Sequence, residues 1–372
     1  MNAALWVLTF IIAFLLGGAA AYFAAPKRRR FRKKPAERHR IMSNALEFRL
    51  SLGTRVVAIG GGTGLSTLLS GLKGFTRNIT AVVAVTDEGG SSGRLRQEWG
   101  MLPPGDIRNC IVALAENDSS LNSLLNFRFD RGELKGHSLG NLILLATTEM
   151  MGDFQRAVEE LNKLLAIRGQ VLPVTTDNVT LKGETAEGRP LSGELEISDN
   201  GSRLAKLWIE PADAEPLAGV KQAFAEAEII VLGPGSLFTS VLPNLLLSGM
   251  AQLLREAKVP IVYIANLMTQ PKETEGMNIV AHVDWITGIL GTVPDYVLAN
   301  QSAIPAEFLS RYSKIGAEPL YLSAKEESYL ESLGTSVVYG DYCEIKNGKY
   351  LRHNAQNLSE AIMEIVRENR KS

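Results

Sequence analysis

The chain has 372 residues, of which 45% are hydrophobic, 21% charged and 7% aromatic, a composition that fits a folded core and excludes a wholly disordered chain. Its net charge of −1 hides an asymmetry: residues 27–40 carry nine basic side chains and one acidic one, whereas residues 41–372 carry 30 basic and 39 acidic ones. A body this acidic is a poor nucleic-acid binder. The chain has two cysteines and four histidines, which argues against a disulfide scaffold and against a Cys- or His-rich metal site.

The first 26 residues have the pattern of a membrane anchor. Residues 3–25 carry no charge, and at about 1.5 Å per helical residue they span the roughly 30 Å hydrocarbon core. The basic run Lys27–Lys34 follows, and the positive-inside rule keeps it in the cytoplasm. A cleaved signal peptide is the alternative, but its positive charges precede its apolar run. We expect a transmembrane helix in 1–26, a basic juxtamembrane linker over 27–53, and a cytoplasmic body at the inner face of the cell membrane.

Downstream of residue 54, apolar β-branched runs alternate with helical patterns. The sequence predicts strands at 55–60, 79–85, 229–233, 261–265, 296–299 and 336–339. It predicts helices after residue 64 and at 107–116, 121–129, 139–150, 154–167, 239–258, 279–290 and 358–370. This alternation predicts an α/β fold, a Rossmann-like, doubly wound and mostly parallel sheet, within a body of residues 54–372. A period-two pattern predicts a small β-rich insertion over 168–210.

A glycine-rich loop follows the first predicted strand and opens a helix. Glycines let the backbone approach an oxyanion, and the helix N-terminus offers free N–H groups and a positive dipole end. No lysine follows the last glycine, as it would in a P-loop, and Thr67 breaks the dinucleotide fingerprint. The loop predicts a phosphate site, with a plain strand–helix turn as the alternative, at Gly61, Gly62, Thr63 and Gly64.

A second glycine-rich loop follows the second predicted strand. Asp87 ends that strand, where a dinucleotide fold places the carboxylate that holds a ribose, so a nicotinamide oxidoreductase has to be weighed. The chain then continues into a second anion-type nest rather than an ordinary connection, with two guanidinium groups that could clamp phosphate. We interpret Asp87 as a candidate catalytic residue and predict phosphate contacts at Gly90, Ser91, Ser92 and Arg94.

Four further loops carry polar side chains suited to a ligand. For two of them, helix capping by Asp106 and by Ser138 is the alternative. A third, glycine-rich loop again joins a buried strand to a helix, and the fourth offers neutral donors for a base or a sugar. The candidates are Asp106, Arg108 and Asn109, then His137 and Asn141, then Gly233, Gly235 and Ser236, and finally Asn266.

Seven motifs occur in order over residues 54–315: IGGGTGLSTLLSGLK, TDEGGSSGRLR, LPPGDIRNC, GHSLGNL, VLPVTTDNVTL, LGPGSLFTSVLPNLL and NLMTQPKETEG. With them the chain resembles the YvcK-type gluconeogenesis factors, which are relatives of the CofD 2-phospho-L-lactate transferases. The resemblance implies binding of a nucleotide sugar such as UDP-GlcNAc or UDP-glucose, and a role in cell shape and cell-wall supply during gluconeogenic growth. It implies that Gly61–Gly64 meet the diphosphate, that Asp87 lies near the ribose, a metal or the acceptor, and that Gly233–Ser236 and Asn266 lie near the nucleoside.

Three functions follow from these patterns. One is a regulator that binds a UDP-sugar, another is a CofD-like transferase that moves a phospholactyl-type group to an acceptor hydroxyl, and the third is an oxidoreductase. The loops offer no obvious general base beyond Asp87, Asp106 and His137, which favours binding over catalysis. Mg²⁺ is expected only together with a nucleotide diphosphate. Besides the UDP-sugar and the membrane, a cell-wall synthesis protein and a second copy of the chain are candidate partners, and nucleic acid is not.

Overall fold

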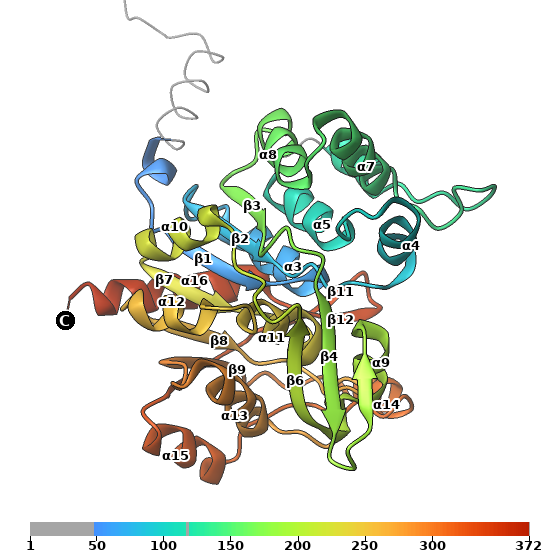
Figure 1. The fold of residues 1–372 in the computed structure, drawn as a ribbon. Coiled ribbons are helices and arrows are strands. Elements are labelled where there is room, and N and C mark those ends of the chain that lie inside the picture. Colours follow the sequence, from blue (N-terminus) through green and yellow to red (C-terminus); the bar gives the residue numbers. More distant parts are fainter. Residues whose placement is uncertain (1–47, 117–118, 372) are drawn as a thin grey trace, which may run out of the picture. The chain divides into compact units, whose positions relative to one another are not determined.

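The computed structural model describes residues 48–116 and 119–371 (Figure 1). The predicted anchor in residues 1–26 and all but the end of the juxtamembrane linker at 27–53 lie outside these residues. Within the described ranges, no single helix has the length and apolar character needed to cross a bilayer. One pair of helices bent by 74°, Leu237–Leu245 and Met250–Glu256, meets these two criteria only when its members are taken together.

A seven-stranded parallel sheet forms the centre of the described body, in the order β10-β9-β8-β7-β1-β2-β3. Its strands are β1 (Val56–Gly60), β2 (Ile79–Val83), β3 (Gln170–Pro173), β7 (Ile229–Leu232), β8 (Ile261–Ile264), β9 (Tyr296–Asn300) and β10 (Ser336–Gly340). The predicted α/β class and the doubly wound parallel sheet are thereby confirmed.

Burial explains why these segments form strands and helices. Every residue of β1, β2, β7 and β8 is buried, as expected for parallel strands that are covered on both faces. Helix α3 (Gly62–Leu72) buries Leu65, Leu68, Leu69 and Leu72, which recur at the spacing of a single helix face. The central strands and the helices against them thus form one continuous hydrophobic core.

The chain winds outward from β1 in two directions. It first runs through β2 to β3, and later returns beside β1 at β7 and continues through β8 to β10 (Figure 1). Because parallel crossovers are right-handed, the helices that connect β1 to β3 lie on one face of the sheet, and those that connect β3 to β7 and β7 to β8 lie on the other. The first half contains α3, α4 (Gly90–Trp99), α5 (Gly105–Leu114), α6 (Ser119–Asn126), α7 (Leu139–Met151) and α8 (Phe154–Leu164). The second contains α10 (Ala218–Glu226), η2 (Leu237–Val241), α11 (Leu242–Leu245), α12 (Met250–Glu256), α13 (Ile279–Leu290), α14 (Ala306–Ser313) and α15 (Ala324–Ser332), and α16 (Ala355–Asn369) closes the chain.

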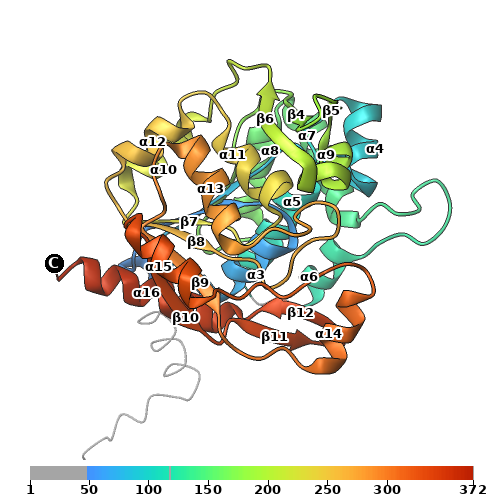
Figure 2. The same ribbon diagram turned by 90° about the horizontal axis from the view of Figure 1, so that it is seen from below.

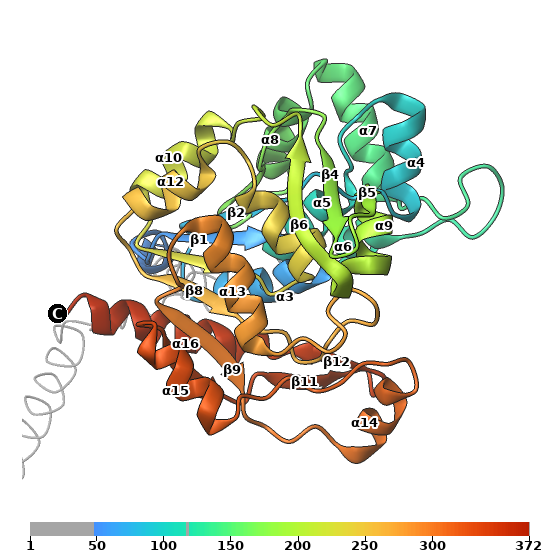
Figure 3. The same cartoon turned by 60° about the horizontal axis from the view of Figure 1, so that its bottom comes forward.

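The predicted β-rich insertion needs one correction at its start. We expected it to begin at residue 168, but β3 joins the main sheet as the edge strand beside β2. The separate part is the antiparallel sheet β5-β4-β6, with strands β4 (Thr180–Thr185), β5 (Pro190–Ser192) and β6 (Leu204–Glu210), together with α9 (Glu194–Asn200) and η1 (Gly201–Arg203) (Figure 3). The buried residues Val171 and Leu172 explain the difference, because a strand that is buried on both faces belongs in the central sheet.

Three other segments differ from the sequence-based expectation. The predicted helix at 239–258 is interrupted before α12 by Gly249, which has a left-handed backbone with φ of 78°. The loop predicted after Asp87 contains helix α4. Near the end of the chain, an unpredicted antiparallel hairpin of β11 (Cys343–Lys346) and β12 (Tyr350–His353) lies beside α14 (Figure 2).

Candidate functional site

A cavity of about 480 Å³ opens at the carboxyl ends of β1, β2, β7 and β8. The winding of the sheet reverses between β1 and β7, and in open α/β sheets ligands bind in the crevice at this reversal. Of the predicted site residues, those that line the cavity are Gly61, Gly62, Thr63, Gly64, Asp87, Asp106, Gly235, Ser236 and Asn266. The structure thus gathers the first and third glycine loops, two of the candidate carboxylates and Asn266 around one space.

The β1–α3 loop presents main-chain amides to this cavity. Gly61 has an extended backbone and Gly62 a left-handed one, with φ of 58°, so the chain turns sharply into the first turn of α3. The N–H groups of a first helical turn have no partner within their own helix. Gly62 donates its N–H to Asp106, while Thr63 and Gly64 line the cavity at the positive end of the helix dipole.

The β7 loop lies directly against this turn. A Cβ atom on Gly64 would be 2.3 Å from the carbonyl oxygen of Pro234, so only glycine allows the two backbones to approach this closely. Asn244 Nδ2 donates to the Gly60 carbonyl oxygen at 3.2 Å and further ties the second half of the chain to the end of β1. Gly233 follows the last residue of β7 but does not itself line the cavity.

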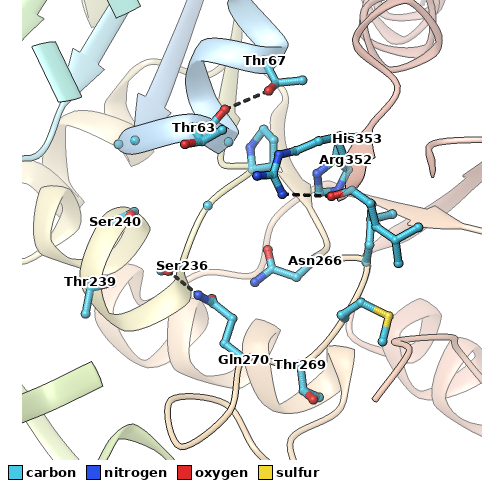
Figure 4. A pocket seen from close by; sticks show the side chains of 18 of the residues that line it. Thr63, Thr67, Ser236, Thr239, Ser240, Asn266, Thr269, Gln270, Arg352 and His353 are labelled. Atoms are coloured by element: carbon cyan, nitrogen blue, oxygen red, sulfur yellow. Dashed lines mark hydrogen bonds between the residues drawn. The ribbon is translucent and has the colours of Figure 1, made fainter. Parts of the chain in front are cut away.

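A buried glutamate holds the segment that follows β7. Glu273 accepts a hydrogen bond from the Phe238 N–H at 3.1 Å, and Gln270 Nε2 donates to Ser236 Oγ at 2.6 Å (Figure 4). Burial raises the pKa of Glu273 to about 7, although its hydrogen bonds to Phe238 and Ser236 oppose the shift. Glu273 is therefore a positioning residue for Ser236, which lines the cavity.

Carboxylates line the side of the cavity next to β2. Asp87 follows β2, Asp106 lies in the first turn of α5, and Glu194 begins α9 of the insertion. Burial raises the pKa of Asp106 to about 7, and the charge of Asp87 adds to the shift. Burial followed by the same Asp87 charge also raises the pKa of Glu194. Asp106 is the second residue of α5 and does not form the helix cap we had weighed for it.

The opposite side of the cavity, next to β8, is formed by the β11–β12 hairpin. Leu351 packs with Met268 and Phe308 in a small core of its own, which sets β12 against the segment that follows β8. Arg352 and His353 line the cavity, and Arg352 is its sole Lys or Arg within the described residues. Burial lowers the pKa of His353 to about 4, so this ring is neutral near pH 7 and Arg352 carries the positive charge.

Asn266 lies between these two sides and points into the open space (Figure 4). It is 8% exposed, and no described residue forms a hydrogen bond with its amide group. Its amide atoms stay accessible from the open cavity, so a bound ligand can replace the water that they would otherwise meet and form hydrogen bonds with them. Asn266 therefore marks the cavity as a polar binding site.

The second glycine loop does not reach the cavity. Gly90, Ser91, Ser92 and Arg94 form the start of α4, and Ser91 Oγ lies 2.9 Å from His137 Nδ1 and 3.0 Å from Asn141 Nδ2. Ser92 Oγ accepts the Gly105 N–H at 3.1 Å. The two serines of this loop therefore bond to groups within the protein, and none of its four predicted residues lines the cavity.

The remaining candidates are also engaged in contacts within the body. Arg94 donates to the Lys135 carbonyl oxygen at 2.7 Å, and Arg108 donates to Asn109 Oδ1 at 2.6 Å. Ser138 caps α7 through the Asn141 N–H, as its alternative role predicted. Arg108, Asn109, His137 and Asn141 do not line the cavity.

The sequence reasoning missed Glu194, Arg352 and His353. Glu194 lies in the insertion, in which the sequence analysis named no candidate residue. Arg352 and His353 lie in the stretch Lys349–His353, which has no glycine loop or recognised motif. Only the pairing of β11 with β12 brings them to the cavity, so no local signal could have identified them.

The carboxylates alone do not form a metal site. Among residues 48–116 and 119–371, no group of three or more His, Cys, Asp or Glu side chains is arranged to hold a metal ion. Mg²⁺ commonly takes one or two protein carboxylates and completes its shell with phosphate oxygens and water. Asp87 and Asp106 therefore suit such an ion only when a phosphorylated ligand is present as well.

The fold and this cavity define a Rossmann-like α/β protein, and comparison with known proteins gives the family. Residues 56–343 match the family model described as 2-phospho-L-lactate transferase CofD. The chain is 43% identical to the gluconeogenesis factor of Halalkalibacterium halodurans, over 83% of this chain and 95% of that protein. It is 40% identical to the gluconeogenesis factor of Bacillus subtilis, over 84% of this chain and 98% of that protein.

A solved structure agrees with these sequence matches. The crystal structure of a UPF0052-family protein from Bacillus halodurans has a TM-score of 0.79 and 41% sequence identity to this chain. The match covers 84% of this chain and 99% of that one. The chain therefore belongs to the CofD family, and over most of its length it is similar to gluconeogenesis factors, as the motifs predicted.

Proposed function

We propose that the cavity binds a nucleotide sugar of the UDP-GlcNAc or UDP-glucose type and that the protein acts as a ligand-dependent regulator of cell morphogenesis and cell-wall supply during gluconeogenic growth. The observation that carries the proposal is the joint presence, around one cavity, of the α3 N-terminus and the Arg352 guanidinium. Main-chain amides and a guanidinium together are suited to the oxygens of a diphosphate.

The rest of the cavity suits the remainder of such a ligand. Asn266 and Gln270 offer amide groups for a base or ribose, and Met268 and Leu351 offer apolar surface beside them. A volume of about 480 Å³ falls within the range of small-molecule sites, which is roughly 300–1,000 Å³. Mg²⁺ held between Asp87, Asp106 and the diphosphate is compatible with this arrangement.

Calorimetric titration of the full-length chain with UDP-GlcNAc and UDP-glucose tests the proposal. We expect saturable binding, and Arg352→Ala should weaken it by roughly 10- to 100-fold, because hydrogen bonds to charged groups contribute about 1.5–3 kcal/mol. Arg367→Ala is the matched control, since Arg367 is an exposed arginine on α16 that does not line the cavity. Absence of heat and of any thermal shift at saturating ligand would remove the proposal.

A transferase is the second candidate, favoured by the family description and by Asp87 and Asp106 in the cavity. In that case Asp87 would lie beside the acceptor hydroxyl. Incubation with a nucleoside diphospholactate, a deazaflavin acceptor and Mg²⁺ separates the two candidates. We expect no product under conditions in which UDP-sugar binding is saturated, and turnover that Asp87→Asn abolishes would establish the transferase instead.

We further propose that residues 3–25 anchor the protein to the cytoplasmic face of the cell membrane, near a partner in cell-wall synthesis. The support is the uncharged segment followed by the basic run Lys27–Lys34. Deletion of residues 1–34 should move the protein from the membrane fraction to the soluble fraction. Retention of the truncated chain on membranes would show that another contact holds it there.

A further inference from the structure

Charge is distributed unevenly along the cavity. Asp87, Asp106 and Glu194 line the side next to β2, and the sole lining arginine within the described residues, Arg352, lies on the side next to β8. The strand order β2-β1-β7-β8 puts three strand spacings between these sides, roughly 14 Å at about 4.8 Å per spacing. The β1–α3 loop lies between them, so a diphosphate held there would extend one substituent toward each side.

The carboxylates on the β2 side form no ion pair with a cationic side chain. None of Asp87, Asp106 and Glu194 forms an ion pair within the described part of the chain. The charge of Arg108 opposes the rise in the pKa of Asp106, but the Nη atoms of Arg108 donate to carbonyl and amide oxygens rather than to a carboxylate. Burial penalises the charged form of Asp106 and Glu194, and Asp87 repels both. The group bound on this side therefore meets a net negative charge.

The insertion holds Glu194 in this place through a reciprocal contact with the β2–α4 loop. The Glu194 N–H donates to the Glu88 carboxylate at 3.1 Å, and the Glu88 N–H donates to the Glu194 carboxylate at 3.3 Å. A Cβ atom on Gly193 would lie 2.1 Å from Glu88 Oε2, so the contact depends on glycine before Glu194. Two hydrogen bonds between backbone N–H groups and carboxylates set the position of Glu194, which is therefore a fixed part of the cavity wall.

We propose that Asp87, Asp106 and Glu194 select the sugar, accepting a neutral hexose on the β2 side of the cavity and rejecting one that carries a carboxylate. This inference rests on the proposed nucleotide-sugar function and adds the class of sugar to it. Sugar hydroxyls donate hydrogen bonds, and ionised carboxylates only accept them, so a neutral hexose is complementary to this side. The carboxylate of a uronic acid would face three carboxylates of the protein. Repulsion between these like charges would lower its affinity relative to that of the neutral hexose. Asn266, buried and without a partner, is independent evidence that a polar ligand fills the same cavity.

UDP-glucose and UDP-glucuronate test the inference directly, because they differ only in the oxidation state of the sugar C6. We expect the full-length chain in EDTA at pH 8 to bind UDP-glucose at least about 10-fold more tightly than UDP-glucuronate, since a like-charge contact costs several kcal/mol. Glu194→Gln should narrow this ratio by raising the affinity for UDP-glucuronate. Glu196→Gln, an exposed change on the same helix away from the cavity, should leave the ratio as it is.

A pH titration gives a second measurement that needs no variant. Asp106 gains a proton as the pH falls from 8 to 6, while the glucuronate carboxylate stays ionised, so the affinity ratio should narrow over this interval. The charged groups around Asp106 are Asp87 and Glu194 on facing segments and Arg108 on its own helix. Equal affinities for the two ligands at pH 8, or a ratio that Glu194→Gln does not change, would overturn the inference and leave the proposed function in place. Binding of neither ligand would overturn both.

Discussion

Two glycine-rich loops follow the neighbouring strands β1 and β2, and the structure uses them differently. Gly61–Gly64 turn into α3 and line an open cavity, with the Gly62 N–H bonded to Asp106 and Thr63 and Gly64 in the first helical turn. Gly90 and the residues after it turn into α4 with side chains that bond to one another, as Ser91 does with His137 and Asn141. Both loops join a buried strand to a helix N-terminus. The same kind of strand-to-helix turn therefore lines a ligand site in one case and packs inside the protein in the other.

The difference teaches that glycine content alone does not identify a binding loop. What separates the two is whether the residues near the turn line an open cavity or bond to other parts of the protein. The serines and arginines of the second loop are paired with carbonyl oxygens and side chains, whereas Asn266 beside the first loop has no partner among the described residues. An unpaired polar group identifies a site only where it faces an open cavity, as Asn266 does.

The largest expected effect comes from Gly64→Ala. The added Cβ would lie 2.3 Å from the Pro234 carbonyl oxygen. The β1–α3 loop and the loop after β7 must therefore move apart, which displaces the main-chain amides at the start of α3. We expect roughly a 100-fold loss of UDP-sugar affinity, together with about 1–3 kcal/mol of lost stability from overpacking. Calorimetry and chemical denaturation measure the two effects.

Gly288→Ala provides the matched control for that change. Gly288 is an exposed residue of α13, and an added Cβ there meets no atom within 4 Å. It should keep full affinity and gain about 0.5–1 kcal/mol of stability, because alanine is the better helix former. If Gly64→Ala bound ligand as well as Gly288→Ala does, the close approach of the two loops would have no part in the site.

Asp106→Asn should change how stability depends on pH. The pKa of Asp106 rises from 3.8 in the unfolded chain to about 7 in the folded one, so the folded state keeps a proton that the unfolded state loses. Stability of the ligand-free protein therefore falls as the pH rises from about 4 to about 7, and Glu273 adds to the fall with the same sign.

The asparagine variant removes the Asp106 contribution to that fall. At pH 8 we expect it to be more stable than the parent chain by up to roughly 4 kcal/mol, and at pH 4 the two should be alike. Denaturant unfolding at a series of pH values measures the difference. Parallel curves for the two proteins between pH 4 and pH 8 would show that Asp106 is not held in a proton-retaining environment.

The smallest effects on binding are expected in the second glycine loop. Ser91→Ala leaves buried groups of His137 and Asn141 unsatisfied and should cost about 1–3 kcal/mol of stability. Arg94→Ala removes a bond to the Lys135 carbonyl oxygen at the surface and should cost less. Both variants should keep the affinity for the UDP-sugar within about twofold, because substitutions at distant sites usually act independently. A loss of affinity like that of Arg352→Ala would make the second loop part of the site and end the contrast between the two.

The sequence was sufficient for the parts of the fold that depend on local patterns. Buried apolar runs such as Val56–Gly60 and leucines at helical spacing such as Leu65–Leu72 identify a parallel sheet and its first helix. Glycine loops after β1 and β7 likewise identify the side of the site that is made of backbone. These features are encoded within a few residues of where they act.

The other side of the site depends on contacts between distant segments. Arg352 reaches the cavity because β12 pairs with β11 and packs on Met268, and Glu194 because its backbone bonds to Glu88, 106 residues away in the sequence. Helix α4 was missed because Gly90, Ser91 and Ser92 favour a loop locally, while their buried hydrogen bonds favour the helix in the folded chain. Contacts between distant segments produce no local periodicity or motif in the sequence, so they could not be predicted from it.

Amide chemical shifts of the glycines test the central claim most directly. In full-length protein labelled with ¹⁵N-glycine, titration with UDP-GlcNAc should shift the amide signals of Gly61, Gly62, Gly64 and Gly235, which line the cavity, and leave those of Gly90, Gly93 and Gly136 in place. Shifts confined to the second group, or saturable binding that moves neither group, would contradict the account that main-chain amides at the end of β1 hold the diphosphate.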